Sequence, residues 1–256
     1  MSDENAKLEI IGRKIFFLYP TQSIQNQIMT EMAQQEFEVY VSKNHTRLAQ
    51  ALKNYPNSII YINVEEGMPL AEWREWISTQ RTALPDIELG VFSSNNDEKF
   101  KDKIINDLHI TCGFFILKMD MTHTTGKLLD ILNTKNVKGR RKYLRANTER
   151  ETAATINMPF RDEFIKGVIK DISVVGISCS FEHDLDLKKN VLFKGIQIRL
   201  QSMLLNLEAV VFGSRMDNNE KIYVMIFTQN ISPEIRSKIR KYIQQNLQGK
   251  MDAEIN

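Results

Sequence analysis

The chain has 256 residues, enough for one large domain or two of ordinary size. Hydrophobic residues make up 42% of it and charged residues 26%, as in an average soluble globular protein. Its 34 basic and 32 acidic side chains leave a formal charge of only +2. This near balance argues against a general nucleic-acid coat, because such a protein needs a strong basic excess.

The first half of the chain alternates short apolar runs with amphipathic stretches. After the first run, Thr21 is placed to cap a helix whose apolar positions, Ile24, Ile28 and Met32, are four residues apart. The same strand-then-helix order occurs five times. We expect the strands at Lys14–Tyr19, Phe37–Val41, Ser58–Val64, Ile87–Phe92 and Cys112–Leu117. Because each helix returns the chain to the same edge of the sheet, this half is predicted to be an α/β domain with a five-stranded parallel sheet.

The order of these elements resembles the receiver domain of response regulators over about 120 residues. That family holds magnesium with acidic residues after the first strand and accepts phosphate on an aspartate after the third. Here no carboxylate follows the first strand, and Asn63 stands where the acceptor would be. An amide is not a phosphate-accepting nucleophile. Although Ser93 or Ser94 and Lys118 match the family's hydroxyl and lysine, we predict a degenerate receiver-like domain that is not phosphorylated.

A basic segment, residues 133–150, separates the two halves and carries seven Lys and Arg residues against one acid. After about Thr148 the pattern changes to alternation with a period of two. From Ile177 to Glu182, for example, apolar side chains face one way and Ser178, Ser180 and Glu182 the other. Several such short strands indicate a small antiparallel barrel. A polar turn is expected over Ser214–Glu220 between the last two strands.

A final helix is predicted to begin at Ser232 and Pro233, with serine as the cap and proline at the first helical position. Its apolar stripe, Ile235, Ile239, Tyr242 and Ile243, is expected to close one end of the barrel, and a polar tail to follow. The expected domains are a receiver-like domain over 1–134, a basic linker over 135–147 and a barrel over 148–256.

Two short patterns in this second half carry a candidate binding site. Arg141 and Arg145 form R-x-x-x-R with Arg140 directly before, and Asp171, Ser173 and Gly176 form D-x-S-x-x-G after 25 intervening residues. In this order and spacing they resemble the signature of the PilZ domain, a bacterial receptor for cyclic di-GMP. The resemblance covers roughly residues 139–247. It implies an all-β, six-stranded antiparallel barrel with a C-terminal helix, and it implies that these six residues bind cyclic di-GMP.

The chemistry of these side chains suits that ligand. Arginine forks match phosphate oxygens, stay charged, and can stack on a guanine or bond its edge. The Asp171 carboxylate can accept the guanine N1–H and N2–H groups, and Ser173 offers a small hydroxyl. Gly176 would let the backbone turn tightly and approach the ligand. The doubled Arg140–Arg141 allows either one ligand molecule or an intercalated pair, and ordering of the linker would change how the two domains sit.

One stretch of the chain departs from the family pattern, and a second copy of the arginine pattern occurs near its end. The family has a glycine in a late strand just ahead of a phenylalanine, whereas this chain has Val224 and Met225 before Phe227. The second R-x-x-x-R, Arg236 to Arg240, is expected on a solvated helix face. Arg199 is expected to be an ordinary surface arginine.

Other classes of site are not indicated. Cys112 and Cys179 lie in apolar stretches, so we expect buried, reduced thiols and a cytoplasmic protein. The histidines are scattered, and Glu65 and Glu66 are expected in a solvated loop, so no metal is predicted. The polar start and the short apolar runs predict neither a signal peptide nor membrane insertion.

The leading hypothesis is a non-enzymatic cyclic di-GMP receptor without a cofactor. We find no nucleophile–base set and no phosphate-binding glycine loop, so no catalytic residue is predicted. The receptor would act on a protein partner that the sequence does not identify. The alternative is a protein- or nucleic-acid-interaction module that uses the basic linker without cyclic di-GMP, although nucleic acid is the less favoured partner.

Overall fold

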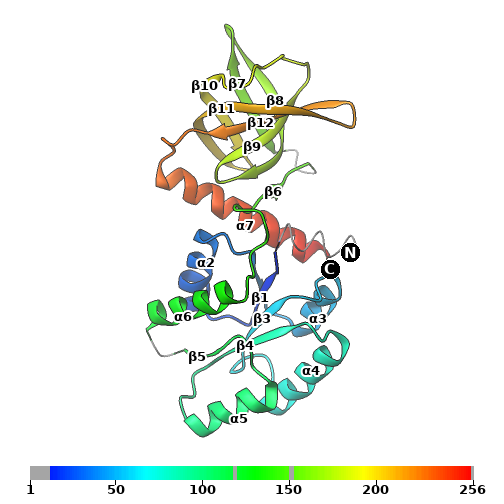
Figure 1. Ribbon diagram of the computed structural model, residues 1–256, viewed down its shortest axis with the longest axis vertical. Helices are drawn as coiled ribbons and strands as arrows, with labels where there is room; N and C mark the ends of the chain where they lie inside the picture. Colours follow the sequence, from blue (N-terminus) through cyan, green and yellow to red (C-terminus); the bar gives the residue numbers. More distant parts are fainter. Residues whose placement is uncertain (1–11, 118–119, 150–152, 255–256) are drawn as a thin grey trace. The chain divides into compact units, whose positions relative to one another are not determined.

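The computed structural model describes residues 12–117, 120–149 and 153–254. The chain forms two compact units (Figure 1): residues 1–142 together with 248–256, called unit 1, and residues 143–247, called unit 2. Each unit has its own hydrophobic core. The domain boundaries expected from the sequence, 1–134, 135–147 and 148–256, stay a prediction.

Unit 1 is built on the predicted five-stranded parallel sheet, which is confirmed with the order β2-β1-β3-β4-β5. Its three inner strands are almost entirely buried, as expected for a sheet covered on both faces, and the two edge strands are partly buried. Their bounds are β1 (Ile15–Leu18), β2 (Val39–Ser42), β3 (Ile59–Asn63), β4 (Glu88–Ser93) and β5 (Phe114–Ile116).

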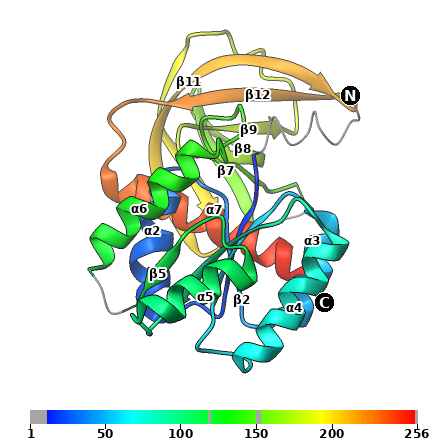
Figure 2. The ribbon, with the colours of Figure 1, turned by 60° about the horizontal axis from the view of Figure 1, so that its bottom comes forward.

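Helices cover both faces of this sheet. Figures 1 and 2 show α2 and α6 on one side and α3, α4 and α5 on the other. The predicted cap is confirmed, since the Ile24 amide donates to Thr21 Oγ1 at 3.4 Å, and Ile24, Ile28 and Met32 are fully buried. The helices are η1 (Ile24–Met29), which runs into α2 (Thr30–Gln34), then α3 (His45–Asn54), α4 (Leu70–Ala83), α5 (Glu98–Leu108) and α6 (Met121–Thr134).

The last helix, α7 (Pro233–Glu254), continues further than the sequence suggested. It begins in unit 2, and its residues from Gln248 onward belong to unit 1. There the Gln248 side chain pairs with the backbone of the edge strand β2, because its Oε1 accepts from Val41 N at 2.8 Å and its Nε2 donates to Val41 O at 3.0 Å. Tyr55 also donates to Glu254 at 2.6 Å. The expected polar tail is therefore wrong, since these contacts hold the segment as helix.

Unit 2 is the predicted six-stranded antiparallel barrel, which is confirmed. The strands follow one another in the order β8-β7-β10-β11-β12-β9, and pairing of β8 with β9 closes the ring. A two-residue strand, β6 (Ala146–Asn147), adds to the outside of β8. The barrel strands are β7 (Ala154–Phe160), β8 (Glu163–Ser173), β9 (Gly176–Phe181), β10 (Leu192–Leu200), β11 (Met203–Asp217) and β12 (Glu220–Phe227).

The turn between β11 and β12 is shorter than the sequence suggested. The two strands stay paired out to Asp217 and Glu220, so the turn consists of Asn218 and Asn219 alone. Both asparagines have positive φ, 46° and 65°, as a two-residue hairpin of the type I′ kind requires. The polar stretch Ser214–Asp217 therefore lies within a strand, because its backbone is paired even though its side chains are exposed.

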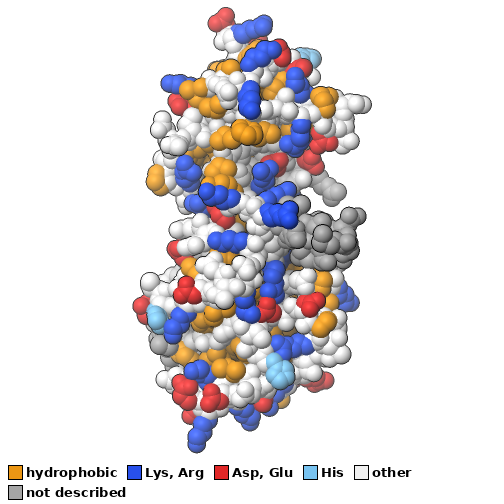
Figure 3. Space-filling view, viewed as in Figure 1, with side chains coloured by type: hydrophobic (Ala, Val, Ile, Leu, Met, Phe, Trp, Pro, Cys, Tyr) orange, Lys and Arg blue, Asp and Glu red, His pale blue; other side chains and the backbone are white. Residues whose placement is uncertain are grey.

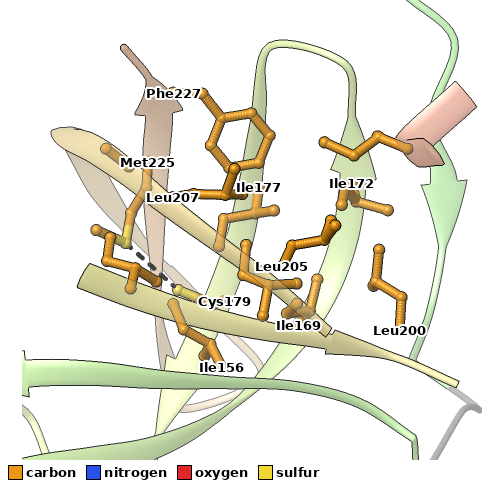
Figure 4. Packing of buried hydrophobic residues seen from close by; sticks show 14 of the residues in the cluster. Ile156, Ile169, Ile172, Ile177, Cys179, Leu200, Leu205, Leu207, Met225 and Phe227 are labelled. Carbon is orange, nitrogen blue, oxygen red and sulfur yellow. Dashed lines mark hydrogen bonds between the residues drawn. The ribbon is translucent and has the colours of Figure 1, made fainter. Parts of the chain in front are cut away.

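The barrel interior is filled by the apolar side chains of alternating strand positions (Figure 4). Ile169, Ile172, Ile177 and Cys179 from β8 and β9 meet Leu205 and other residues from the opposite strands there. The first part of α7 belongs to the same core through its predicted stripe, of which Ile239, Tyr242 and Ile243 are buried. This packing confirms that the final helix follows and packs on the barrel.

Acidic and basic side chains are interspersed on the face of the molecule that Figure 3 shows, in keeping with the near-neutral charge. Among the described residues, no helix has both the length and the apolar character to cross a membrane.

Candidate functional site

The D-x-S-x-x-G pattern forms the end of β8, a tight turn and the start of β9. Ser173 pairs with Gly176 across the turn, which leaves Val174 and Val175 at its tip. The Ser173 hydroxyl, 5% exposed as a residue, donates to Gly176 O at 3.2 Å and accepts from Val175 N at 3.4 Å. In this structure Ser173 therefore closes its own turn.

Gly176 is fixed by its neighbour strand. A Cβ at this position would lie well inside 3.0 Å of Met225 O and 3.2 Å from Ile226 Cα, both backbone atoms of β12. Since Ile226 is its pairing partner in the β12–β9 ladder, only glycine fits at this spacing. Gly176 thus lies close against the backbone of β12, and its predicted approach to a ligand stays a prediction.

Arg145 and Asp171 meet beside this turn. Arg145 directly precedes β6, whose residues Ala146 and Asn147 pair with Ile172 and Asp171. The Arg145 Nη1 and Asp171 Oδ1 atoms are 3.4 Å apart, and the two side chains are 49% and 22% exposed. The pair is long and solvent-accessible, so both groups are open to a ligand.

Asp171 has a second partner that the sequence did not single out. Its Oδ2 accepts a hydrogen bond from the hydroxyl of Ser178, which lies directly opposite on β9 and is 2% exposed. The alternation in β9 placed Ser178 on the outward face, but it is the pairing register, which the sequence does not give, that brings it to Asp171.

Arg140 and Arg141 lie in unit 1, which includes Lys142, whereas the other four predicted residues lie in unit 2. Both arginines are exposed. The structure thus brings together Arg145, Asp171, Ser173 and Gly176. The binding roles of all six residues stay predictions.

The remaining positions noted in the sequence lie apart from the site chemistry. Arg199 is exposed, and its Nε donates to Gln201 O at 3.1 Å. Met225, in the stretch where the family has a glycine, points into the barrel core next to Cys179 (Figure 4). Burial raises the pKa of the Cys179 thiol, and likewise that of Cys112, to about 12.

In the receiver-like unit, the residue at the position of the phosphate acceptor is held by hydrogen bonds within the protein. Asn63, at the end of β3, is 1% exposed, and its Nδ2 donates to Tyr19 O at 3.0 Å. The neighbouring Glu65 is exposed, but its carboxylate accepts from Ser93 Oγ at 2.5 Å and Ser94 N at 2.8 Å. Although partial burial raises the pKa of Glu65, these hydrogen bonds outweigh it and lower the pKa below its usual value.

The family's lysine position, Lys118, lies outside the described residues. Within the described ranges, no three His, Cys, Asp or Glu side chains cluster as a metal site would require. The carboxyl edge of this sheet thus lacks the acidic cluster, among the residues described, on which receiver chemistry depends.

Comparison with known proteins identifies the second half of the chain. Residues 139–245 match the model of the PilZ domain family. The chain gives no match to curated protein sequences.

Three solved structures illustrate what the two halves are similar to. The PilZ domain of YcgR from Escherichia coli, solved with c-di-GMP, is 16% identical, with a TM-score of 0.35 and coverage of 45% of this chain and 93% of that one. The inhibitor of motility MotI from Bacillus subtilis is 19% identical, with a TM-score of 0.36 and coverage of 41% and 50%. A response regulator from Thermotoga maritima is 14% identical, with a TM-score of 0.41 and coverage of 48% and 99%.

The matched segment contains the whole signature, from Arg140 to Gly176, and nearly the whole barrel with the first turns of α7. It follows a five-stranded parallel sheet of the receiver type, from which the acidic pocket of that family is missing among the described residues. Residues 139–245 of this chain therefore match the PilZ domain family, and they follow a receiver-like domain built on a five-stranded parallel sheet.

Proposed function

We propose that this chain is a receptor for cyclic di-GMP and that it binds the dinucleotide through Arg140, Arg141, Arg145, Asp171, Ser173 and Gly176. The observation that carries the proposal is the exposed Arg145–Asp171 pair beside the β8–β9 turn, inside the segment that matches the PilZ domain. Occupancy of this site changes the arrangement of the two units or the binding of a protein partner. No reaction is involved, so the ligand is released unchanged.

The Arg145–Asp171 pair supports the proposal because a ligand can replace each partner of this weak ion pair at little cost. At 3.4 Å and with 49% of the arginine side chain exposed, such a pair is worth no more than about 1 kcal/mol. A ligand phosphate can take the place of Asp171 beside Arg145, and a guanine edge can take the place of Arg145 beside Asp171. Each protein charge then keeps a partner of opposite polarity, so binding leaves no charge unpaired.

Arg140 and Arg141 extend this chemistry. Cyclic di-GMP carries two phosphates and two guanines, more acceptors and ring faces than Arg145 alone can satisfy. Both arginines are exposed and lie within six residues of Arg145 in the sequence. We assign them to the phosphates and to stacking on guanine.

Isothermal titration calorimetry with cyclic di-GMP tests the site directly. The wild type binds, and Arg141→Ala and Asp171→Ala each weaken binding by about tenfold or more, because each removes a charge-assisted hydrogen bond. Arg199→Ala, an exposed arginine elsewhere on the barrel, is the matched control and leaves affinity unchanged. Cyclic di-AMP binds much more weakly than cyclic di-GMP, because adenine lacks the N1–H and N2–H donors that Asp171 accepts. Wild-type protein that binds neither dinucleotide would remove the proposal.

The same titrations separate the receptor from a module that uses the basic linker on phosphate backbones. Such a module tolerates Asp171→Ala, binds oligonucleotides with steep salt dependence and does not distinguish guanine from adenine in cyclic dinucleotides. The fitted stoichiometry distinguishes one bound molecule from an intercalated pair. Small-angle X-ray scattering with and without ligand then tests the relay, for which we expect a change in the radius of gyration at saturation.

A further inference from the structure

The position of Asp171 depends on an irregularity in β8. Ile169 pairs with Cys179, so an unbroken register would place Asp171 opposite Ile177 and turn it toward the core. Instead the register shifts between Ile169 and Asp171, and Asp171 faces Ser178. One extra residue in β8 thus keeps Ile172 in the core and turns Asp171 outward, as a bulge does when it re-aims a side chain.

The fully buried Thr148, which lies outside β8 in the sequence, forms two hydrogen bonds to the backbone at the bulge. Its amide donates to Lys170 O at 2.8 Å, and its hydroxyl donates to Ile169 O at 2.5 Å. The carbonyl groups of the two residues just before Asp171 therefore each have a donor beside the register shift. The backbone of Asp171 is set before any ligand arrives.

The carboxylate of Asp171 is then oriented by two different donors. Oδ2 accepts from Ser178, which is 2% exposed, whereas Oδ1 faces the half-exposed Arg145. A ligand can displace Arg145, which water already reaches, but it cannot displace a buried hydroxyl on the neighbouring strand. The Ser178 bond therefore persists when the arginine moves away.

We infer that Ser178 is a positioning residue for ligand selectivity: its hydroxyl holds the Asp171 carboxylate in the plane needed to accept guanine N1–H and N2–H together. This rests on the proposed function. Without that bond the carboxylate can rotate about its terminal torsion, which has broad minima, and the paired geometry is lost. A single acceptor can still meet one of the two guanine donors.

Cyclic di-IMP provides the probe, because hypoxanthine keeps N1–H and lacks the N2 amino group. For the wild type we expect cyclic di-GMP to bind about tenfold more tightly than cyclic di-IMP. In Ser178→Ala the affinity for cyclic di-GMP falls about tenfold and the preference over cyclic di-IMP shrinks to about twofold. Ser180→Ala is the matched control: it removes a hydroxyl of equal burial on the same strand, bonded to Glu220 instead, and keeps both the affinity and the preference.

The outcomes are distinct. If the wild type binds no cyclic di-GMP, the proposed function fails. If the wild type binds and discriminates while Ser178→Ala does so equally well, the role of Ser178 is refuted and the receptor stands. If Ser178→Ala weakens both ligands by the same factor, the hydroxyl supports the fold only and the inference is again overturned. Thermal unfolding of each variant shows that the barrel remains folded at the titration temperature.

Discussion

Replacing Gly176 with alanine separates what this glycine does for the barrel from what it does for a ligand. The new Cβ would meet Met225 O and Ile226 Cα, which are backbone atoms of a paired strand and cannot swing aside as a side-chain end would. Overpacking of this kind costs about 1–3 kcal/mol. For a barrel of about 100 residues, 2 kcal/mol lowers the midpoint of thermal unfolding by about 10 °C.

Circular dichroism melts and urea titrations of the full chain measure this loss, with Gly213→Ala as the control. Gly213 also lies in the barrel, on β11, but a Cβ there meets no atom within 4 Å, so we expect its stability to stay within about 0.5 kcal/mol of the wild type. If Gly176→Ala is as stable as Gly213→Ala, the packing argument is refuted. If it is stable and yet fails to bind cyclic di-GMP, the glycine serves the approach of the ligand.

Three further predictions concern other parts of the molecule. Incubation with acetyl phosphate leaves unit 1 unlabelled, as judged by intact mass, because the Asn63 amide is not a phosphate acceptor and is buried against a backbone carbonyl; a mass gain of one phosphate there would contradict this. The folded protein reacts slowly with a thiol reagent at pH 8 and rapidly in urea, since burial raises the pKa of Cys112 and Cys179 to about 12; fast labelling of folded protein would count against it. Glu88 has a pKa of about 2, because hydrogen bonds and charges from two cationic partners outweigh its partial burial. A depressed carboxyl pKa stabilises the fold above the unfolded value of 4.5 and loses that stabilisation as the pH falls toward 2, so wild type should lose more stability than Glu88→Gln over this range in urea titrations.

The two folds were predictable because each has one dominant period. Strand-then-helix repetition with buried runs such as Ile59–Asn63 leaves few alternatives to a parallel sheet. The alternation from Ile177 to Phe181 fits only a strand with one apolar and one polar face. What the sequence did not reveal depends on pairing between distant segments. The length of the β11–β12 hairpin is one case: Ser214–Asp217 is polar, and only pairing with β12 makes it a strand.

The candidate site shows the same limit. Asp171, Ser173 and Gly176 could be chosen from the sequence because their spacing matches a family signature. Ser178 could not, because nothing in the local pattern reveals a bulge that changes which residue Asp171 faces. The helical character of Gln248–Glu254 was also hidden, since its polar side chains find their partners about 200 residues away in unit 1.

The pairing of Gln248 with β2 bears on how the edge of this sheet is protected. An edge strand presents free amide and carbonyl groups on which a strand of another molecule can assemble. At Val41 the Gln248 amide supplies one donor and one acceptor in the place of a neighbouring strand, so this part of the edge is already occupied. A fragment that ended before Gln248 would expose that edge and would also lack the buried Met251, now 4% exposed. The final turns of α7 thus prevent a strand of another molecule from pairing with this part of β2.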